Sequence, residues 1–302
     1  MKVLLTGATG FVGRHIREAL AERWTIVAPR HQELDVTDDA AVDRVLRDGR
    51  FDAVVHAAVQ GGANVLDSTL RGYWNFARNA SRVGRIVYFG SGAEFAKHRD
   101  LVKVREDAIG DVTPRDPYGL AKLICTTLAR GSDNIVNLRL FGVFGPYEGY
   151  KAKFISNAVA KTLAGVPLVI RQNVVFDYLW IDDLVRMLPT FVEGERRFAD
   201  VNATPAESVK LTDIAALVLR EGNSRSEIEI ETPGLNFQYT GDNGRLLESC
   251  PGFAFTPVRD GVRKLFEYYR SHMELIDREA LEADEYRRRC TARTAEGMET
   301  RK

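Results

Sequence analysis

The feature that most constrains the fold of this chain is a glycine-rich segment close to its N-terminus. Residues 6–13 read TGATGFVG, directly after the apolar run Lys2–Thr6 and at the start of the amphipathic stretch Phe11–Arg23. The first glycine permits a sharp turn, the second lets the backbone approach a phosphate, and the third lets a helix pack on a strand. The helix N-terminus would then offer free N–H groups to a pyrophosphate. The segment predicts a dinucleotide-binding turn, and a glycine-rich turn without a ligand is the alternative. The expected contacts are Gly7, Thr9, Gly10, Phe11, Val12 and Gly13.

Short apolar runs alternate with amphipathic stretches through the first half of the chain. The runs are apolar on both faces, which is typical of parallel strands covered by helices on both sides. The alternation predicts an α/β fold with a doubly wound parallel sheet of the Rossmann type. The expected strands are Lys2–Thr6, Thr25–Ala28, Ala53–Ala57, Arg85–Phe89 and Ile135–Leu140, and the expected helices are Phe11–Arg23, Ala40–Asp48, Leu66–Val83 and Tyr118–Arg130.

The rhythm changes after Gly145-Pro146, where helices and short strands follow one another less regularly. We expect a smaller C-terminal α/β lobe that is interleaved with the nucleotide domain and holds the substrate. The predicted nucleotide domain comprises residues 1–150 and about 179–205, and the predicted substrate lobe about 151–178 and 206–275. Charge dominates from Glu274 onward, so residues 276–302 are predicted to be a charged tail, helical or disordered.

Composition and charge argue against several classes of function. Acidic and basic residues number 42 each, so no net field would attract nucleic acid or a membrane surface. The longest apolar runs, such as Ala53–Val59, are too short to cross a bilayer. The three cysteines form no close pair, which favours a reducing cytoplasm. The five histidines lack ligand-like spacing, so we expect no metal site.

The residues after the second predicted strand bear on the choice of dinucleotide. NAD sites place a carboxylate there for the ribose hydroxyls, whereas NADP sites often place an arginine. Here Pro29-Arg30-His31 follows the strand, with no carboxylate before Glu33. Arg30 would pair with a 2′-phosphate, which favours NADP(H). An NAD(H) site with an ordinary surface arginine is the alternative.

A tyrosine and a lysine form a candidate proton-transfer pair. Asp116-Pro117 is typical of a helix start, which places Tyr118 and Lys122 on one face and one turn apart. A neighbouring ammonium lowers the pKa of a phenol, so that the phenol can exchange a proton with a carbonyl oxygen. Ser91 ends an earlier predicted strand, at the sheet edge where ligands bind, and would donate a hydrogen bond to the same oxygen. A solvated tyrosine-lysine pair and a turn serine are the alternatives.

These motifs occur in the order found in extended short-chain dehydrogenases. They are TGATGFVG, HAA at 56–58, Ser91, the Tyr118 and Lys122 pair, LRLF at 138–141 and Gly145-Pro146. Over about residues 1–205 the chain resembles the NAD-dependent epimerase/dehydratase family, whose members mostly act on nucleotide sugars. The resemblance implies a homodimer and a Lys122 that also holds the nicotinamide ribose. It further implies dinucleotide contacts from Asp35, Val36, Ala57 and Ala58.

Within this family the chain is most similar to the GDP-L-fucose synthase group, through Val27–Asp38 and Phe144–Pro146. Ala93 and Tyr147 stand where that group carries the cysteine and histidine that invert carbons beside the ketone. We therefore do not expect that pair to invert the carbons beside the ketone, but we still expect reduction of the ketone. The segment Ser91–Phe95 also lacks the Asp-Glu pair of the 4,6-dehydratases, so we expect Glu94 to be structural.

Phe176 is a further departure, because it replaces an arginine that family members place on the nucleotide diphosphate. Arg171 or Lys153 is the expected substitute, since a diphosphate needs charged partners. The residues expected to contact the substrate are Gln60, Tyr147 and Lys153.

The leading hypothesis is NADPH-dependent reduction of a 4-keto nucleotide sugar, with Tyr118 as general acid, Ser91 orienting the ketone and Lys122 tuning the phenol. An NAD-dependent nucleotide-sugar 4-epimerase would use the same three residues with a retained cofactor. A dinucleotide-binding regulator without catalysis is the third alternative.

Overall fold

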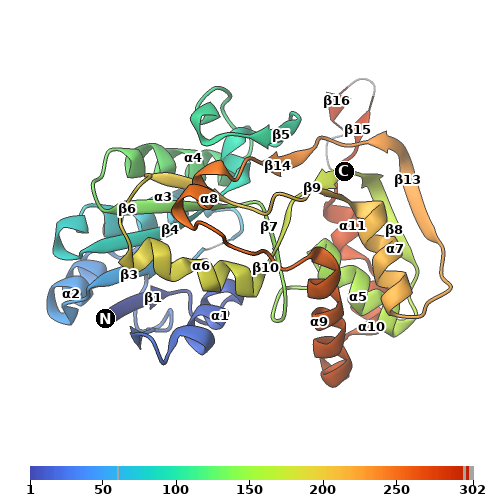
Figure 1. The fold of residues 1–302 in the computed structure, drawn as a ribbon, viewed down its shortest axis with the longest axis horizontal. Coiled ribbons are helices and arrows are strands. Elements are labelled where there is room, and N and C mark those ends of the chain that lie inside the picture. Colours follow the sequence, from blue (N-terminus) through green and yellow to red (C-terminus); the bar gives the residue numbers. More distant parts are fainter. Residues whose placement is uncertain (60, 295–296, 299–302) are drawn as a thin grey trace.

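The protein is organised around a parallel sheet of six strands (Figure 1). In chain order these are β1 (Lys2–Thr6), β2 (Thr25–Val27), β3 (Ala53–His56), β4 (Arg85–Ser91), β6 (Ile135–Leu140) and β11 (Asp200–Ala203). They lie in the order β11-β6-β4-β3-β1-β2, and every neighbouring pair is parallel. The structure is a computed structural model and describes residues 1–59, 61–294 and 297–298. The sheet confirms the predicted doubly wound α/β fold.

The strand order fixes where a ligand can bind. The chain leaves β1 toward β2 on one side and toward β3 on the other. In such sheets the crevice beyond the carboxyl ends of the strands at this switch point is the ligand site. The glycine-rich segment 7–13 follows β1 there, and Ala57 follows β3.

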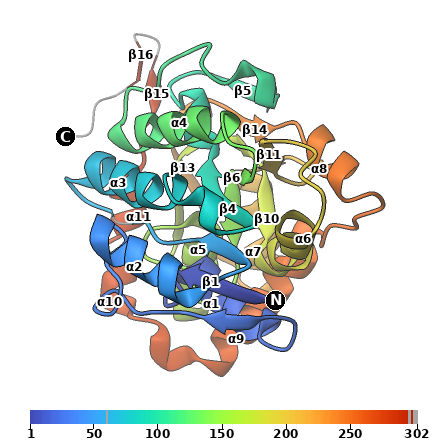
Figure 2. The same cartoon turned by 90° about the vertical axis from the view of Figure 1, so that its left-hand side faces the viewer.

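Helices cover both faces of the sheet: α1 (Phe11–Leu20) and α6 (Ile181–Glu193) on one, and α2 (Asp39–Gly49), α3 (Val65–Ala77) and α4 (Pro117–Arg130) on the other. This follows from strands that are apolar on both sides. Leu5 belongs to the core under α1 and α6, whereas its neighbour Leu4 belongs to the core under α2, α3 and α4. Figure 2 shows α3 and α4 side by side on their face of the sheet.

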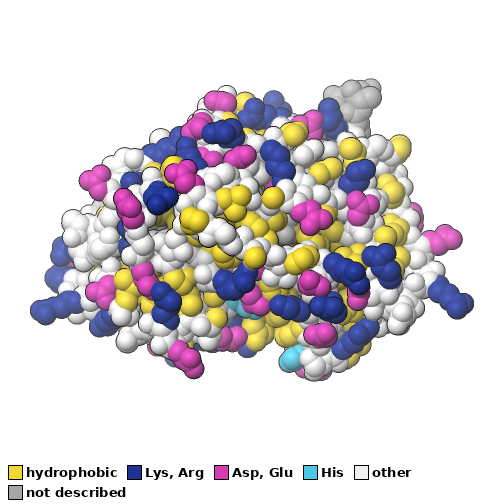
Figure 3. Space-filling model, in the orientation of Figure 1, with side chains coloured by type: hydrophobic (Ala, Val, Ile, Leu, Met, Phe, Trp, Pro, Cys, Tyr) yellow, Lys and Arg dark blue, Asp and Glu magenta, His cyan; other side chains and the backbone are white. Residues whose placement is uncertain are grey.

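A smaller lobe lies on the right of Figure 1. It contains α5 (Phe154–Ala164), α7 (Leu211–Glu221) and α9 (Val258–Ser271), packed beside the parallel strands β8 (Leu168–Asn173) and β13 (Ile228–Leu235). The chain enters this lobe at α5, returns to the main sheet at β11 and re-enters the lobe at α7. The exact boundaries between the two lobes stay a prediction. Figure 3 shows acidic and basic side chains mixed over the face in view, with apolar side chains between the lobes.

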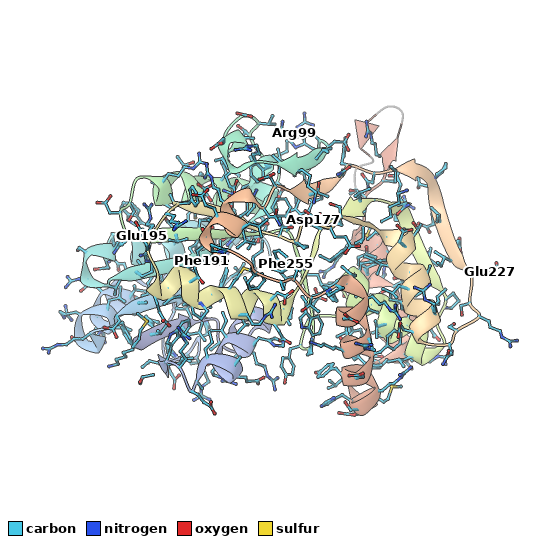
Figure 4. The ribbon with its side chains drawn as sticks, viewed as in Figure 1. Arg99, Asp177, Phe191, Glu195, Glu227 and Phe255 are labelled. Carbon is cyan, nitrogen blue, oxygen red and sulfur yellow. The ribbon has the colours of Figure 1, made fainter. Side chains whose placement is uncertain are left out.

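Short strands join the two lobes. One sheet pairs β7 (Gly142–Phe144) with β10 (Tyr178–Trp180), and another has the order β12 (Val209–Lys210), β9 (Val175–Phe176), β14 (Tyr239–Gly241), β5 (Leu101–Val104). Asp177, labelled in Figure 4, is buried between β9 and β10. Its carboxylate accepts hydrogen bonds from Thr204 Oγ1 (3.0 Å) and the Gly241 amide (2.9 Å) and pairs with Lys103 Nζ (3.3 Å). The remaining helix before the C-terminal segment is α8 (Gly244–Ser249). Four 3-10 turns are also present: η1 (Ala80–Arg82), η2 (Gly92–Phe95), η3 (Glu106–Ala108) and η4 (Met273–Leu275).

The C-terminal segment is more tightly packed than its charged composition suggests. It contains α10 (Arg278–Glu282), α11 (Glu285–Arg289) and the short hairpin β15 (Arg293–Thr294) and β16 (Gly297–Met298). Leu281 is buried against α5, and Lys161 Nζ of α5 forms a buried ion pair of 2.7 Å with Asp284. Part of the charge is thus neutralised inside the protein, which a count of charges cannot reveal. Across the described ranges, no helix is long and apolar enough to span a bilayer.

A buried ion-pair network ties together the strand ends next to the ligand crevice. The Arg139 guanidinium of β6 is fully buried and donates from Nε to Glu94 (2.7 Å) and from Nη2 to Asp200 (2.8 Å). Although burial opposes it, this guanidinium lowers the pKa of the Asp200 carboxyl. Glu94 is therefore a structural residue, as the sequence predicts, because both of its oxygens are engaged within the protein.

We predict that Arg139→Met lowers the free energy of unfolding by about 3–5 kcal/mol, because it leaves two buried carboxylates without their main cation. Urea unfolding of the purified variant measures the loss. Arg130→Ala is the matched control, since Arg130 also pairs with Asp200 but is partly exposed, and it should cost less than half as much. Equal losses in the two variants would contradict this account.

Candidate active site

A groove of about 820 Å³ runs along the glycine-rich segment at the carboxyl ends of β1 and β3. It contains all but one of the dinucleotide contacts predicted for this region. Asp35 is the exception, because its carboxylate is turned back to accept hydrogen bonds from the Thr37 amide (2.9 Å) and hydroxyl (2.8 Å). The predicted residues that line the groove are Gly7, Thr9, Gly10, Phe11, Val12, Gly13, Arg30, Val36, Ala57 and Ala58.

The geometry of the glycine segment fits a dinucleotide. Gly7 has a φ of +70°, a conformation that side chains disfavour. A Cβ on Gly13 would lie 2.2 Å from the Gly7 carbonyl oxygen, so the close packing of α1 on this turn requires glycine. No side chain caps the N-terminus of α1 at Gly10. Its free N–H groups are therefore available to a pyrophosphate.

The groove carries positive charge at Arg30, which does not line the cavity of Ser91, Tyr118 and Lys122. Arg30 and His31 line it, and among the described lining residues there is no carboxylate. The Arg30 side chain is exposed, and its Nη2 lies 3.5 Å from Glu33, which also accepts a hydrogen bond from the Arg30 amide (2.7 Å). Glu33 thus braces the backbone at Arg30 and leaves most of the guanidinium open to an anion.

The structure brings Ser91, Tyr118 and Lys122 together in a cavity of about 630 Å³ that adjoins the groove. Asp116 caps α4 by accepting from the Gly119 amide (2.9 Å), and this fixes the first turn that carries Tyr118. Lys122 Nζ lies 5.7 Å from the centre of the Tyr118 ring and donates to the Phe89 carbonyl (2.7 Å). Ser91 forms a hydrogen bond with the Tyr118 hydroxyl.

Burial sets the protonation of this set. It lowers the pKa of Lys122 to about 8. It raises the pKa of Tyr118, and the hydrogen bond from Ser91 only partly opposes this. The sequence led us to expect a Tyr118 pKa lowered by Lys122. Instead, desolvation of the phenol raises this pKa, and the nearby carboxylates of Glu94 and Asp116 raise it further.

The short strands that join the lobes, together with Phe141 after β6, supply an aromatic wall that the sequence did not predict. Tyr239 of β14 hydrogen-bonds to Ser91, and its ring lies 4.8 Å from Phe176 of β9 and 5.2 Å from Phe141, measured between centres. All three line the catalytic cavity. Phe176, for which the family resemblance implied an arginine, is thus part of this wall. No local pattern marks Tyr239, because only the pairing of β14 with β9 and β5 brings it to Ser91.

The three predicted substrate contacts have different outcomes. Lys153 lines the cavity, and Gln60 lies outside the described residues. Tyr147 does not line the cavity, so this prediction is corrected. Its φ of +66° turns the side chain away, and its ring packs under the Arg14 guanidinium, whose carbon lies 3.6 Å from the ring centre.

Glu148, the next residue, lies in the cavity instead. Its side chain is only 6% exposed and accepts a hydrogen bond from the Ser156 hydroxyl of α5. Burial raises the pKa of Glu148 to about 7. One feature of the sequence points to this residue, which lies two positions after the Gly145-Pro146 pair.

The C-terminal segment closes another side of the cavity through Tyr286, Arg289, Cys290 and Thr291. The Asn236 amide donates to the Thr291 carbonyl (2.7 Å), and the Tyr286 ring packs 5.7 Å from Phe154. The cavity is rich in positive charge, and the described part of its lining contains one carboxyl, Glu148. The cations that line it are Lys97, Lys122, Lys153, Arg171 and Arg289.

No group of three His, Cys, Asp or Glu side chains within residues 1–59, 61–294 and 297–298 is arranged to hold a metal ion. A glycine-lined groove beside a Ser/Tyr/Lys cavity on a doubly wound sheet defines an enzyme that uses a nicotinamide dinucleotide. Residues 3–202 match the NAD dependent epimerase/dehydratase family, and the chain belongs to this family.

The chain is also similar in sequence to curated relatives and similar in fold to solved structures. The chain is 27% identical over 325 residues to dTDP-4-dehydro-6-deoxy-D-allose reductase of Streptomyces bikiniensis, covering 89% of this chain and 96% of that protein. The fold superposes on UDP-glucose 4-epimerase of Thermotoga maritima with a TM-score of 0.79 at 19% identity, covering 90% and 100% of the two chains. It superposes on a GDP-L-fucose synthetase from Naegleria fowleri with a TM-score of 0.78 at 16% identity, covering 90% and 95%.

The raised pKa of Glu148 predicts a pH-dependent stability. The folded state holds this proton up to about pH 7, whereas the unfolded chain releases it near its ordinary pKa of 4.5. The stability contributed by protonated Glu148 is therefore lost as the pH rises between these values. Glu148→Gln removes the titrating group, so the stability of the variant relative to wild type should increase by about 2–3 kcal/mol between about pH 5 and pH 8.

Urea unfolding at the two pH values measures this difference. Glu227→Gln is the control, because Glu227 is exposed at the periphery of the molecule (Figure 4). A gain as large in the control as in Glu148→Gln, or no gain in Glu148→Gln, would show that burial of Glu148 is not the cause.

Proposed function

We propose that the protein is an NADPH-dependent reductase of a 4-keto nucleotide sugar. The observation that carries the proposal is the meeting of Ser91, Tyr118 and Lys122 in one cavity that adjoins the dinucleotide groove. The family and the alignment with a dTDP-4-dehydro-6-deoxy-D-allose reductase along 89% of the chain support it.

The residues of this chain divide the proton chemistry among them. Bound NADPH supplies the hydride. Tyr118 donates its phenolic proton to the ketone oxygen as negative charge develops there, and its raised pKa keeps the phenol protonated for this step. Ser91 donates a hydrogen bond to the same oxygen. Lys122, which also holds the nicotinamide ribose, stabilises the phenolate that remains.

The proposed preference for NADPH rests on Arg30. A 2′-phosphate needs a charge-assisted partner, and the guanidinium of Arg30 is available at the end of the groove. A ribose 2′-hydroxyl would be recognised by a carboxylate, which the described lining residues do not supply. Val36, Ala57 and Ala58 provide the apolar sides of the groove.

The proposed substrate class rests on the charge of the cavity. A nucleotide diphosphate carries negative charge and needs cationic partners. Phe176 carries no charge, but Lys153, Arg171 and Arg289 line the same cavity. Arg171 is held in place by Glu231 (3.1 Å), so its guanidinium is already oriented. A dinucleotide-binding regulator would need no such cluster of cations beside a proton donor.

We propose a homodimer formed by the outer face of α3 and α4. Trp74, Ile124 and Leu128 are exposed there by 53%, 36% and 42%, and exposed large apolar side chains on adjacent helices suit a contact between two copies. The neighbouring charge of Arg71 is paired with Asp67 and would not repel a second copy. Sedimentation equilibrium should give a dimer for wild type and a monomer for Leu128→Glu. We also propose a cytoplasmic location, because Cys125 and Cys250 are buried free thiols.

We predict that Tyr118→Phe lowers the rate of NADPH-dependent ketone reduction at least about 100-fold while NADPH binding persists, because only the proton donor is lost. Stopped-flow absorbance and fluorescence titration measure the two quantities. Tyr147→Phe removes a phenol outside the cavity and should keep the rate within about twofold. A protein that purifies with bound NAD and consumes no added NADPH would instead favour the 4-epimerase.

We predict that Arg30→Ala raises the KM for NADPH about 10- to 100-fold and leaves the KM for NADH nearly unchanged, because only the 2′-phosphate loses a partner. Initial rates with each cofactor test this. Arg17→Ala, an exposed change outside the groove, controls for net charge. Tighter binding of NADH than NADPH by the wild type would refute the proposed preference.

A further inference from the structure

Reduction of a ketone uses one acid, yet the cavity holds a second group of suitable acidity that this reaction leaves idle. Glu148 follows the strand β7 and the Gly145-Pro146 turn, where its amide bonds to the Gly145 carbonyl (3.3 Å). It lines the same cavity as Ser91 and Tyr118. It is the one carboxyl that does so among the described lining residues.

The surroundings of Glu148 are unusual for a carboxyl that serves packing alone. The Ser156 hydroxyl donates to it, and the buried Tyr178 and Tyr269 lie near enough to act on it electrostatically. Within the part of the chain that the structure describes, no lysine or arginine forms an ion pair with it, and Lys153 acts only at longer range. A buried carboxyl without a cation costs stability, and glutamine or leucine would fill the same space without that cost.

Protonated and ionised Glu148 are both populated near neutral pH, since burial brings its pKa to about 7. Such a group can accept a proton and return it. The proton that such a group can remove from a keto sugar is one on a carbon beside the ketone. This C–H bond is acidic because the electron pair left behind is delocalised into the carbonyl group. Ser91 and Tyr118 line the same cavity and can stabilise the carbonyl oxygen that receives this charge by hydrogen bonding.

We propose that Glu148 is a general base and acid that removes and returns a proton at a carbon adjacent to the ketone of the bound sugar, so that the enzyme enolises its substrate as well as reducing it. In the forward step the C–H bond breaks and its proton goes to the Glu148 carboxylate. The electron pair forms the C=C bond of the enol, and the carbonyl oxygen takes the proton of Tyr118. The reverse step restores both bonds, and no oxidant or reductant is consumed. The proposal rests on the proposed function, because it requires a keto sugar in the cavity.

Glu148 lies one residue away from the position at which the family resemblance implied an acid-base group. Ala93 and Tyr147 occupy the positions at which a cysteine and a histidine would act, and Tyr147 is turned out of the cavity. Tyr147 packs against Arg14, whereas the next residue, Glu148, lines the cavity. The carboxyl of Glu148 is therefore the group of this segment that can exchange a proton with the bound sugar.

The experiment measures exchange with solvent in the absence of a hydride donor. The wild-type enzyme with NADP⁺ is incubated in D₂O with dTDP-linked and, separately, GDP-linked 4-keto-6-deoxyhexose. Mass spectrometry follows the gain of deuterium, and proton NMR locates the carbon. Wild type should accelerate exchange at a carbon beside the ketone over the rate in buffer. Glu148→Gln should lower this rate at least about 100-fold, and Glu148→Asp should lower it less.

Controls separate this role from folding and from the reduction itself. Glutamine keeps the size of glutamate and can still accept from Ser156, and urea unfolding reports whether the variant is folded. Tyr147→Phe should keep wild-type exchange. NADPH consumption with the same two ketones is measured for every variant, and the ratio of exchange to reduction should fall at least about 10-fold in Glu148→Gln.

The outcomes distinguish the two proposals. If wild type reduces a ketone but does not exchange its adjacent hydrogen, or if Glu148→Gln exchanges at the wild-type rate, the role of Glu148 is overturned and the reductase stands. If wild type reduces neither ketone, the proposed function fails and the role of Glu148 fails with it.

Discussion

The contact between Arg139 and Glu94 is the interaction on which the arrangement of the site depends. Glu94 accepts from Arg139 and from the Thr126 hydroxyl of α4 through one oxygen and from the Ser91 amide through the other. A single buried carboxylate therefore connects the end of β4, the strand β6 and the helix that carries Tyr118. Because a charge buried in this way must keep its partners, Ser91 is held in a fixed position relative to the phenol.

Burial shifts the pKa values of three groups of this cavity, Tyr118, Lys122 and Glu148, in the direction that favours the neutral form of each. It raises the pKa of Tyr118, brings that of Glu148 to about 7 and that of Lys122 to about 8. A neutral phenol is the form that donates a proton to a ketone. A carboxyl poised near neutrality is the form that both accepts and returns one. One physical cause thus prepares two different proton transfers.

The two lobes contribute different parts of the site. The main sheet holds the groove and the Ser/Tyr/Lys set, as the carboxyl edge of a doubly wound sheet does in general. The short strands that join the lobes add Tyr239 and Phe176, and the C-terminal segment adds Arg289. The buried pair between Lys161 and Asp284 anchors that segment to α5. The lining of this cavity therefore includes residues far along the chain from the motifs that identify the family.

The sequence by itself determined the doubly wound sheet, the glycine-lined groove and the family, because these follow from local patterns: apolar runs, a turn that needs glycine, and residues one helical turn apart. Only the tertiary structure decided what fills the cavity. Tyr239 and Arg289 reach it through long-range packing, Tyr147 has a positive φ and packs against Arg14 outside it, and the next residue, Glu148, lines it. The direction of the Tyr118 pKa shift could not be predicted from the sequence either. Desolvation depends on how much protein surrounds a group and not on its neighbours along the chain.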